Sequence, residues 1–142
     1  QKENVFLAGA SMGGHVASRL SKKFSFKAVI LQCPAAYIST AETKKFDSGF
    51  TYILHNSWGW DNSPAIKDIK QYAGPVLVIY GSHDTEIPQT VQNLYKQIGN
   101  KQGKAVILSG GAHSLLNPKN AKEKQARTEL YMQSFSFIKS YT

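Results

Sequence analysis

The chain has 142 residues, of which 42% are hydrophobic and 18% charged, and its formal net charge is +8. This length and composition are typical of one globular domain with its own core, and they exclude wholesale disorder. No apolar run approaches the ~20 residues of a membrane-spanning helix and no signal peptide is visible, so we predict a cytoplasmic protein without a membrane span.

The positive charge does not by itself indicate a nucleic-acid partner. Lysines are spread along the whole chain, whereas a nucleic-acid surface needs a basic cluster with interleaved aromatic residues. We therefore expect no nucleic-acid partner and interpret the charge as solvated loops and helix faces. The single cysteine, Cys33, excludes an internal disulfide, and we expect it to be a small buried hydrophobic residue instead of a reactive thiol.

The first predicted strand leads into a glycine-rich turn. The apolar run Val5–Ala8 predicts a buried strand, which ends at the pattern Gly9-x-Ser11-x-Gly13. This context of strand, sharp turn and helix is the one in which G-x-S-x-G holds a serine hydroxyl above a sheet. The motif alone is a weak signal, because a glycine-rich loop without chemistry has the same residues. A helix is predicted from Met12 to about Phe24, and its core face is expected to hold Val16, Ala17, Leu20 and Phe24.

The second predicted strand, Ala28–Gln32, is followed by a long aromatic-rich connection. Residues 35–73 form either a lid or substrate-pocket wall, or a satellite hydrophobic cluster beneath a long loop. Pro64 is predicted to open a short helix through Ile69. Three aromatic residues of this segment are candidate substrate-binding residues: Tyr37, Trp58 and Trp60.

The rest of the chain repeats the alternation of strand and helix. Strands are predicted over Pro75–Tyr80 and Ala105–Ser109, with a helix from Pro88 to about Ile98 that Gly99-Asn100 closes. A long final helix is predicted after Pro118, and its apolar positions are Ala126, Leu130, Met132, Phe135, Phe137 and Ile138.

Strands that alternate with helices predict an α/β fold, in which about four parallel strands carry helices on both faces. Ligands of such sheets bind beyond the carboxyl ends of the strands. Three chemistry-bearing residues follow strands at that edge: Ser11, Asp84 and His113. Acyl transfer by a serine needs a base for the hydroxyl, an acid that orients the base, and donors for the oxyanion.

Each of these three residues is predicted to have one role in acyl transfer. Ser11 is the predicted nucleophile, His113 the base, and Asp84 the orienting acid, with Glu86 as the runner-up acid. The backbone N–H of Met12 is the predicted oxyanion donor. His15 is expected to be a packing or surface histidine. The mechanism needs no cofactor and no metal.

The same residues carry a resemblance to a known superfamily. The segments Gly9–Gly14, Gly81–Pro88 and Gly110–His113 resemble the nucleophile elbow, acid loop and histidine loop of α/β hydrolases, in that order. The resemblance covers nearly the whole chain and implies a serine esterase or lipase-like enzyme. An aspartate in place of Ser11 would suit a dehalogenase and a cysteine a dienelactone-type hydrolase, so the serine argues against both chemistries.

The resemblance begins only at the elbow. The superfamily has eight strands with the elbow after the fifth, so the chain resembles its C-terminal half and lacks the loop that gives the second oxyanion donor. We therefore expect residues 1–142 to be a partial α/β-hydrolase domain with a lid-like insertion over 35–73. A missing N-terminal segment or a second chain would complete the sheet.

The sequence thus predicts a serine hydrolase that cleaves a small-molecule carboxylic ester through Ser11, His113 and Asp84. Thioesterase, acyltransferase and serine peptidase activities stay open within that class. A non-catalytic α/β-hydrolase-like binding module, or an inactive fragment, is the alternative from another class.

Overall fold

The fold places one sheet between two layers of helices. A computed structural model describes residues 4–56 and 60–142. Its strands are β1 (Phe6–Ala10), β2 (Ala28–Gln32), β3 (Val76–Gly81) and β4 (Gly103–Leu108). Its α-helices are α1 (Met12–Lys23), α2 (Ser48–Asn56), α3 (Pro64–Gln71), α4 (Gln89–Gln102) and α5 (Ala121–Ser140). Two short 3₁₀ helices are η2 (Ser39–Thr43) and η3 (Trp60–Asn62).

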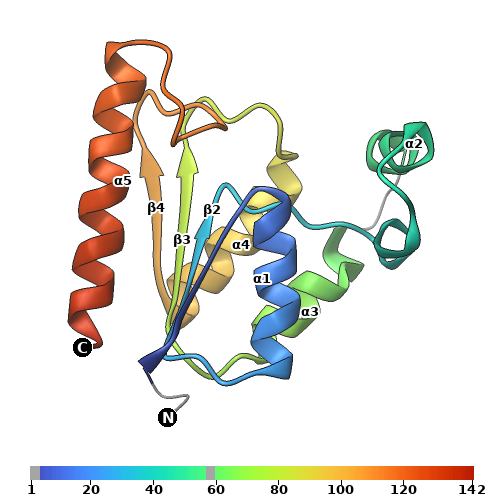
Figure 1. The fold of residues 1–142 in the computed structure, drawn as a ribbon, viewed down its shortest axis with the longest axis horizontal. Helices are drawn as coiled ribbons and strands as arrows, with labels where there is room; N and C mark the ends of the chain where they lie inside the picture. The colour runs from blue at the N-terminus through green and yellow to red at the C-terminus, as the bar shows by residue number, and fades with distance from the viewer. Residues whose placement is uncertain (1–3, 57–59) are drawn as a thin grey trace.

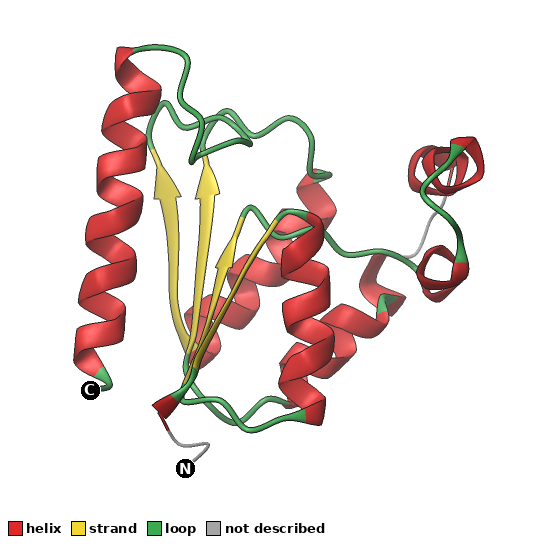
Figure 2. Cartoon of the chain, viewed as in Figure 1, coloured by secondary structure: helices red, strands yellow, loops and turns green. Residues whose placement is uncertain are grey.

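The sheet has the order β1-β2-β3-β4, and each neighbouring pair is parallel. Figure 2 shows that all four strands run in one direction, so the loops that follow them gather at one end of the sheet. Helix α5 lies on one side of the sheet, whereas α1, α3 and α4 lie on the other (Figure 1). The predicted α/β fold with a parallel sheet and helices on both faces is therefore confirmed.

The centre of the sheet holds the core. The strands β2 and β3 are buried on both faces, as their continuous apolar runs predict. Within the described residues, the outer strand β1 pairs with β2 alone, and Ala8 and Ala10 on it are exposed. One edge of the sheet is thus open to a further strand.

The face of α1 that is buried differs from the predicted one. Val16 and Phe24 are half exposed, although the apolar spacing predicted that they face the core. The buried residues of α1 are mostly small, because the helix lies close to its neighbours and a Cβ on Gly14 would lie 2.5 Å from the Cβ of Pro34. They are Gly14, His15, Ala17, Ser18 and Ser21.

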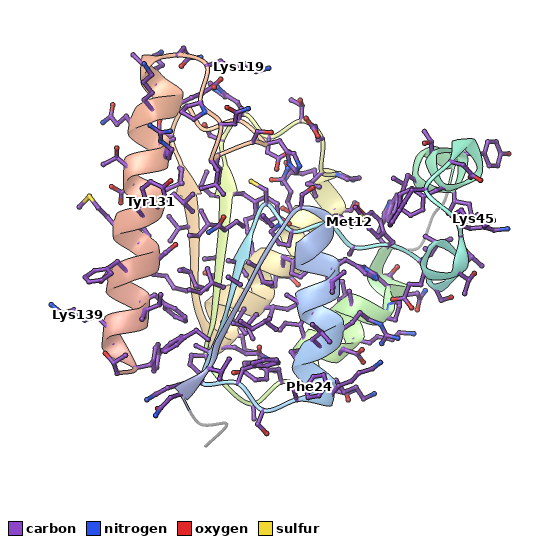
Figure 3. The ribbon with its side chains drawn as sticks, in the orientation of Figure 1. Met12, Phe24, Lys45, Lys119, Tyr131 and Lys139 are labelled. Atoms are coloured by element: carbon purple, nitrogen blue, oxygen red, sulfur yellow. The ribbon has the colours of Figure 1, made fainter. Side chains whose placement is uncertain are left out.

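The final helix also buries fewer apolar residues than its sequence predicts. Ala126, Leu130 and Phe137 are buried, but Met132 and Phe135 are exposed on α5. Figure 3 shows Tyr131 and Lys139 along α5, on the side of the sheet away from Met12 of α1. One helix face covers the sheet, and the remaining apolar side chains of α5 lie outside that contact.

Glycine at position 99 does not end α4. The helix was predicted to close at Gly99-Asn100 but continues to Gln102, and β4 begins directly after it. A Cβ on Gly99 would lie 2.8 Å from the carbonyl oxygen of Lys104. The glycine therefore allows the next strand to approach the helix closely.

The segment 35–73 has two parts. Helix α3 begins at Pro64 as predicted, and its residues Ile66 and Ile69 are fully buried in the core beside α1. The part that contains η2 and α2 projects from the body of the molecule (Figure 1). A lid over the whole of 35–73 stays a prediction. None of the helices in the described ranges is both long and apolar enough to span a membrane.

Candidate active site

Ser11 stands on a sharp turn between β1 and α1. Its backbone has φ 52° and ψ −120°, a conformation that L-residues rarely adopt, and its N–H donates to the carbonyl of Gln32 at 3.0 Å. The turn is so tight that a Cβ on Gly9 would lie 2.2 Å from the carbonyl oxygen of Gly13. The G-x-S-x-G pattern therefore forms the strained elbow that its residue types predict.

Asp84 lies in the loop after β3, and its side chain is fully buried. Its Oδ1 accepts hydrogen bonds from the backbone N–H groups of Glu86 and Ile87, at 3.0 and 3.1 Å. The amide of Gln92 on α4 donates to the carbonyl of Asp84 at 3.1 Å. These bonds hold the carboxylate in one orientation, with Oδ2 directed to the next loop.

His113 follows β4 and joins the other two residues. Its Nε2 lies 2.8 Å from Ser11 Oγ, and its Nδ1 lies 3.0 Å from Asp84 Oδ2. The structure thus brings the predicted nucleophile, base and acid into one hydrogen-bonded chain. In this arrangement the imidazole can take the hydroxyl proton at Nε2 while Nδ1–H stays hydrogen-bonded to the carboxylate.

The interaction between Asp84 and His113 favours the charged form of each side chain. The hydrogen bond to Asp84 raises the pKa of His113 above its ordinary value, against partial burial, which lowers it. Burial of the Asp84 carboxyl opposes its ionisation, but the hydrogen bonds from His113 and from the N–H of Ile87 outweigh it and lower its pKa. Asp84 is therefore an anion at neutral pH and favours a positively charged imidazole.

Cys33 lies close to Asp84 and His113, and the sequence predicted only that it is a small buried hydrophobic residue. It is buried as predicted, and its backbone has φ 43°. One ligand atom each of Cys33, Asp84 and His113 lie within 4.8 Å of one another, so these three could in principle hold a metal ion. Burial raises the pKa of the Cys33 thiol to about 12, which keeps it protonated at neutral pH. Its hydrogen bond to Asp84 favours the carboxylate anion.

Two cavities meet at Ser11 and His113. One has a volume of about 220 Å³, and two of the aromatic residues predicted to bind substrate, Tyr37 and Trp60, line it. The third, Trp58, lies outside the described residues. The other cavity has a volume of about 230 Å³ and is lined by Ala10, Ser11, Gln32, His113, Ser114, Leu115, Leu116 and Asn117.

The predicted oxyanion donor begins α1. Met12 is the first residue of that helix, so its backbone N–H has no partner within the helix. It directly follows Ser11, as an oxyanion donor of an elbow does. The Met12 side chain lines a separate apolar cavity of about 330 Å³ between α1 and the projecting segment.

His15 was expected to be a packing or surface histidine, and the structure gives it a buried position with two partners. Its Nε2 donates to Glu42 Oε1 at 2.8 Å, and its Nδ1 accepts the backbone N–H of Tyr37 at 3.0 Å. Burial lowers the pKa of His15, against the hydrogen bond with Glu42. His15 therefore holds the backbone of Tyr37, which lines the cavity beside Ser11 and His113, a role with no signal in the sequence.

The model of the dienelactone hydrolase family matches residues 1–142. Among solved structures, an acylaminoacyl peptidase bound to Z-Gly-Gly-Phe-chloromethyl ketone is similar, with 22% identity and a TM-score of 0.65 over 96% of this chain and 24% of that one. Dipeptidyl peptidase 4 of Porphyromonas gingivalis has 21% identity and a TM-score of 0.68 over 100% of this chain and 20% of that one. A monoacylglycerol lipase of Paleococcus ferrophilus has 15% identity and a TM-score of 0.64 over 99% of this chain and 70% of that one.

These similarities confirm the α/β-hydrolase fold predicted from the sequence. A comparison with curated proteins found no match. The chain spans less than a third of the length of the two peptidases. Because position 11 is a serine and not a cysteine, the sequence disfavoured dienelactone-type chemistry. The family match shows that a chain with serine at this position can still belong to that family.

Proposed function

The chain belongs to the dienelactone hydrolase family, and on that premise we propose that it is a serine hydrolase that cleaves a carboxylic ester. Ser11 is the nucleophile, His113 the general base and acid, and Asp84 the residue that orients and stabilises the imidazole. The observation that carries the proposal is the chain of hydrogen bonds from Ser11 Oγ to His113 and on to Asp84, at 2.8 and 3.0 Å.

The proposed reaction proceeds through an acyl-enzyme. His113 Nε2 takes the proton of Ser11 as Oγ attacks the carbonyl carbon, and the N–H of Met12 donates to the oxyanion. The imidazolium then protonates the departing alkoxide as the carbon–oxygen bond breaks. A water molecule then attacks the acyl-enzyme: His113 removes a proton from the water as the water oxygen bonds to the acyl carbon. The bond between that carbon and Ser11 Oγ breaks, and the imidazolium returns the proton to Oγ.

The two cavities support a substrate with a group on each side of the scissile bond. Each cavity reaches Ser11 and His113, so one is suited to the acyl group and the other to the leaving group. Tyr37 and Trp60 are proposed to bind substrate in the first of them. Peptidases are among the structural neighbours as well as esterases, so an amide substrate is an alternative to an ester, as are a thioester and transfer to another acyl acceptor.

The open edge of β1 supports a further proposal about the sheet. A strand that pairs with β1 would cover the exposed Ala8 and Ala10. We propose that this strand is supplied by a preceding segment or by a second chain. The cytoplasmic location and the absence of a nucleic-acid partner stay predictions from the sequence.

A fluorophosphonate probe tests the proposed nucleophile, because it reacts only with an activated serine. We expect intact mass to show one adduct on the folded chain and none on Ser11→Ala. Ser114→Ala is the matched control, since Ser114 lines the same cavity and its variant is expected to keep the adduct. An adduct retained by Ser11→Ala would contradict the assignment. A folded chain without any adduct would favour the non-catalytic binding module.

The pH dependence of ester hydrolysis tests the base. His113 must be neutral to accept the proton of Ser11, so kcat/KM rises as the pH passes through the pKa of His113. The hydrogen bond to Asp84 raises that pKa above the ordinary histidine value of 6.5. We therefore expect the rising limb of kcat/KM, measured with an uncharged ester, to have its midpoint above pH 6.5. A midpoint below that value would contradict the ion pair between His113 and Asp84.

A further inference from the structure

The cavity beside Tyr37 carries one negative charge. Glu86 lines it together with Ser11 and His113, and the side chain of Glu86 is 70% exposed. Its backbone N–H donates to Asp84 Oδ1 at 3.0 Å, so the fixed acid loop also positions Glu86. The backbone of Glu86 is therefore fixed beside the cavity, and its exposed carboxylate, 3.6 Å from His113 Nε2, can contact a bound molecule.

Glu86 is not a second acid of the hydrogen-bonded chain. The distance from its Oε2 to His113 Nε2 is 3.6 Å, which is too long for a hydrogen bond. That nitrogen is instead hydrogen-bonded to Ser11 Oγ at 2.8 Å. The Nδ1 of the same ring is bonded to Asp84. Glu86 is thus not hydrogen-bonded to His113, although its charge at 3.6 Å contributes to the raised pKa of that imidazole.

The surroundings of Glu86 suit a cation. Among the described residues that line this cavity it is the only carboxylate, and the others are neutral side chains and His113: Ser11, Ala35, Ala36, Tyr37, Leu54, Trp60, Ile87 and Pro88. Aromatic rings attract cations through their faces, and a carboxylate attracts them by charge. The cavity on the other side of Ser11 has no acidic side chain among its described lining residues.

We propose that Glu86 selects substrates that carry a cationic nitrogen on the side of the scissile bond that enters this cavity. The proposal rests on the proposed hydrolase function and names its substrate class: esters or amides with an ammonium group a few bonds from the scissile carbonyl. Glu86 binds the cation by charge, and Tyr37 and Trp60 supply the aromatic wall. The chain as a whole has a positive net charge. The carboxylate of Glu86 gives this cavity the opposite charge, which favours a cationic substrate there.

Two isosteric esters test the selection. The 4-nitrophenyl ester of 4-(trimethylammonio)butyrate carries a permanent positive charge, and that of 5,5-dimethylhexanoate has carbon in place of the nitrogen. We expect the ratio of kcat/KM, cationic over neutral, to fall about tenfold in Glu86→Gln and further in Glu86→Lys. Glu129→Gln on α5, which removes the same charge away from the cavity, should keep the wild-type ratio. An unchanged ratio in Glu86→Gln, including an equal loss for both esters, would overturn the proposal.

A binding measurement separates failure of this inference from failure of the proposed function. The primary amides of the same two acids are titrated into the Ser11→Ala variant and followed by NMR, so no turnover is needed. We expect the cationic amide to bind about tenfold more tightly than the neutral one, and Glu86→Gln in the same background to remove the difference. Equal affinities would overturn the inference even where fluorophosphonate labels Ser11. Selective binding without any labelling would retain it and contradict only the hydrolase proposal.

Discussion

Asp84→Asn is expected to lower kcat for ester hydrolysis by about 10⁴-fold while the fold is kept. The asparagine amide would occupy the volume of the buried carboxylate, and its oxygen could still accept the N–H groups of Glu86 and Ile87. Its NH₂ group would then face His113 Nδ1, which stabilises the tautomer with the proton on Nε2. That nitrogen could no longer accept the proton of Ser11, and the imidazolium would lose its counter-charge.

The measurement is steady-state hydrolysis of a neutral ester, together with the rate of fluorophosphonate labelling. Asp47→Asn is the matched control, because Asp47 is exposed and accepts the N–H of Gly49 at 2.9 Å, a bond that asparagine can also accept. That variant should keep the wild-type kcat. Wild-type turnover in Asp84→Asn would show that another group orients His113.

Gly81→Ala is expected to disrupt the site through the backbone. A Cβ on Gly81 would lie 2.2 Å from the carbonyl oxygen of Gly111, so the loops that carry Asp84 and His113 must separate by about an ångström. We expect kcat to fall about 10²-fold, because catalytic geometry tolerates little displacement. Thermal or urea denaturation should show a loss of about 1–3 kcal/mol in the free energy of unfolding.

The control for this variant is Gly13→Ala, which adds the same methyl group. Apart from its chain neighbours and the backbone of its own helix, no atom lies within 4 Å of a Cβ on Gly13. Alanine is favoured over glycine in a helix by about 1 kcal/mol. The control should therefore be at least as stable as the wild-type chain. Gly81→Ala with unchanged stability and turnover would show that the two loops can accommodate the methyl group.

The parts of the structure that the sequence predicted follow from periodicity and chain order. Continuous apolar runs located β2 and β3 within a residue or two, because strands buried on both faces need such runs. Parallel strands end at the same edge of a sheet, so the chain order alone predicts that Ser11, Asp84 and His113 lie close together. Their roles as catalytic residues await the labelling and kinetic tests.

The parts that the sequence did not predict depend on contacts between distant segments. Nothing local distinguishes His15 as a partner of Glu42 and of the Tyr37 N–H, since those contacts span 27 and 22 residues. The buried face of α1 was misjudged because packing distance, not hydrophobicity, selected small residues there. Glu86 was considered only as an alternative acid, because its exposure and its distance from His113 Nε2 are properties of the folded loop.

The order of the four strands in the sheet matches their order in the chain. The strands β2, β3 and β4 can therefore each pair with a strand that was synthesised earlier. Ser11 and His113 are separated by 102 residues, and they follow β1 and β4 respectively. Their hydrogen bond can form only after the loop that follows β4 has been synthesised. We therefore expect no fluorophosphonate labelling of Ser11 in a nascent chain halted before that point. The rate at which fluorophosphonate labels Ser11 would thus report when β4 joins the sheet during translation.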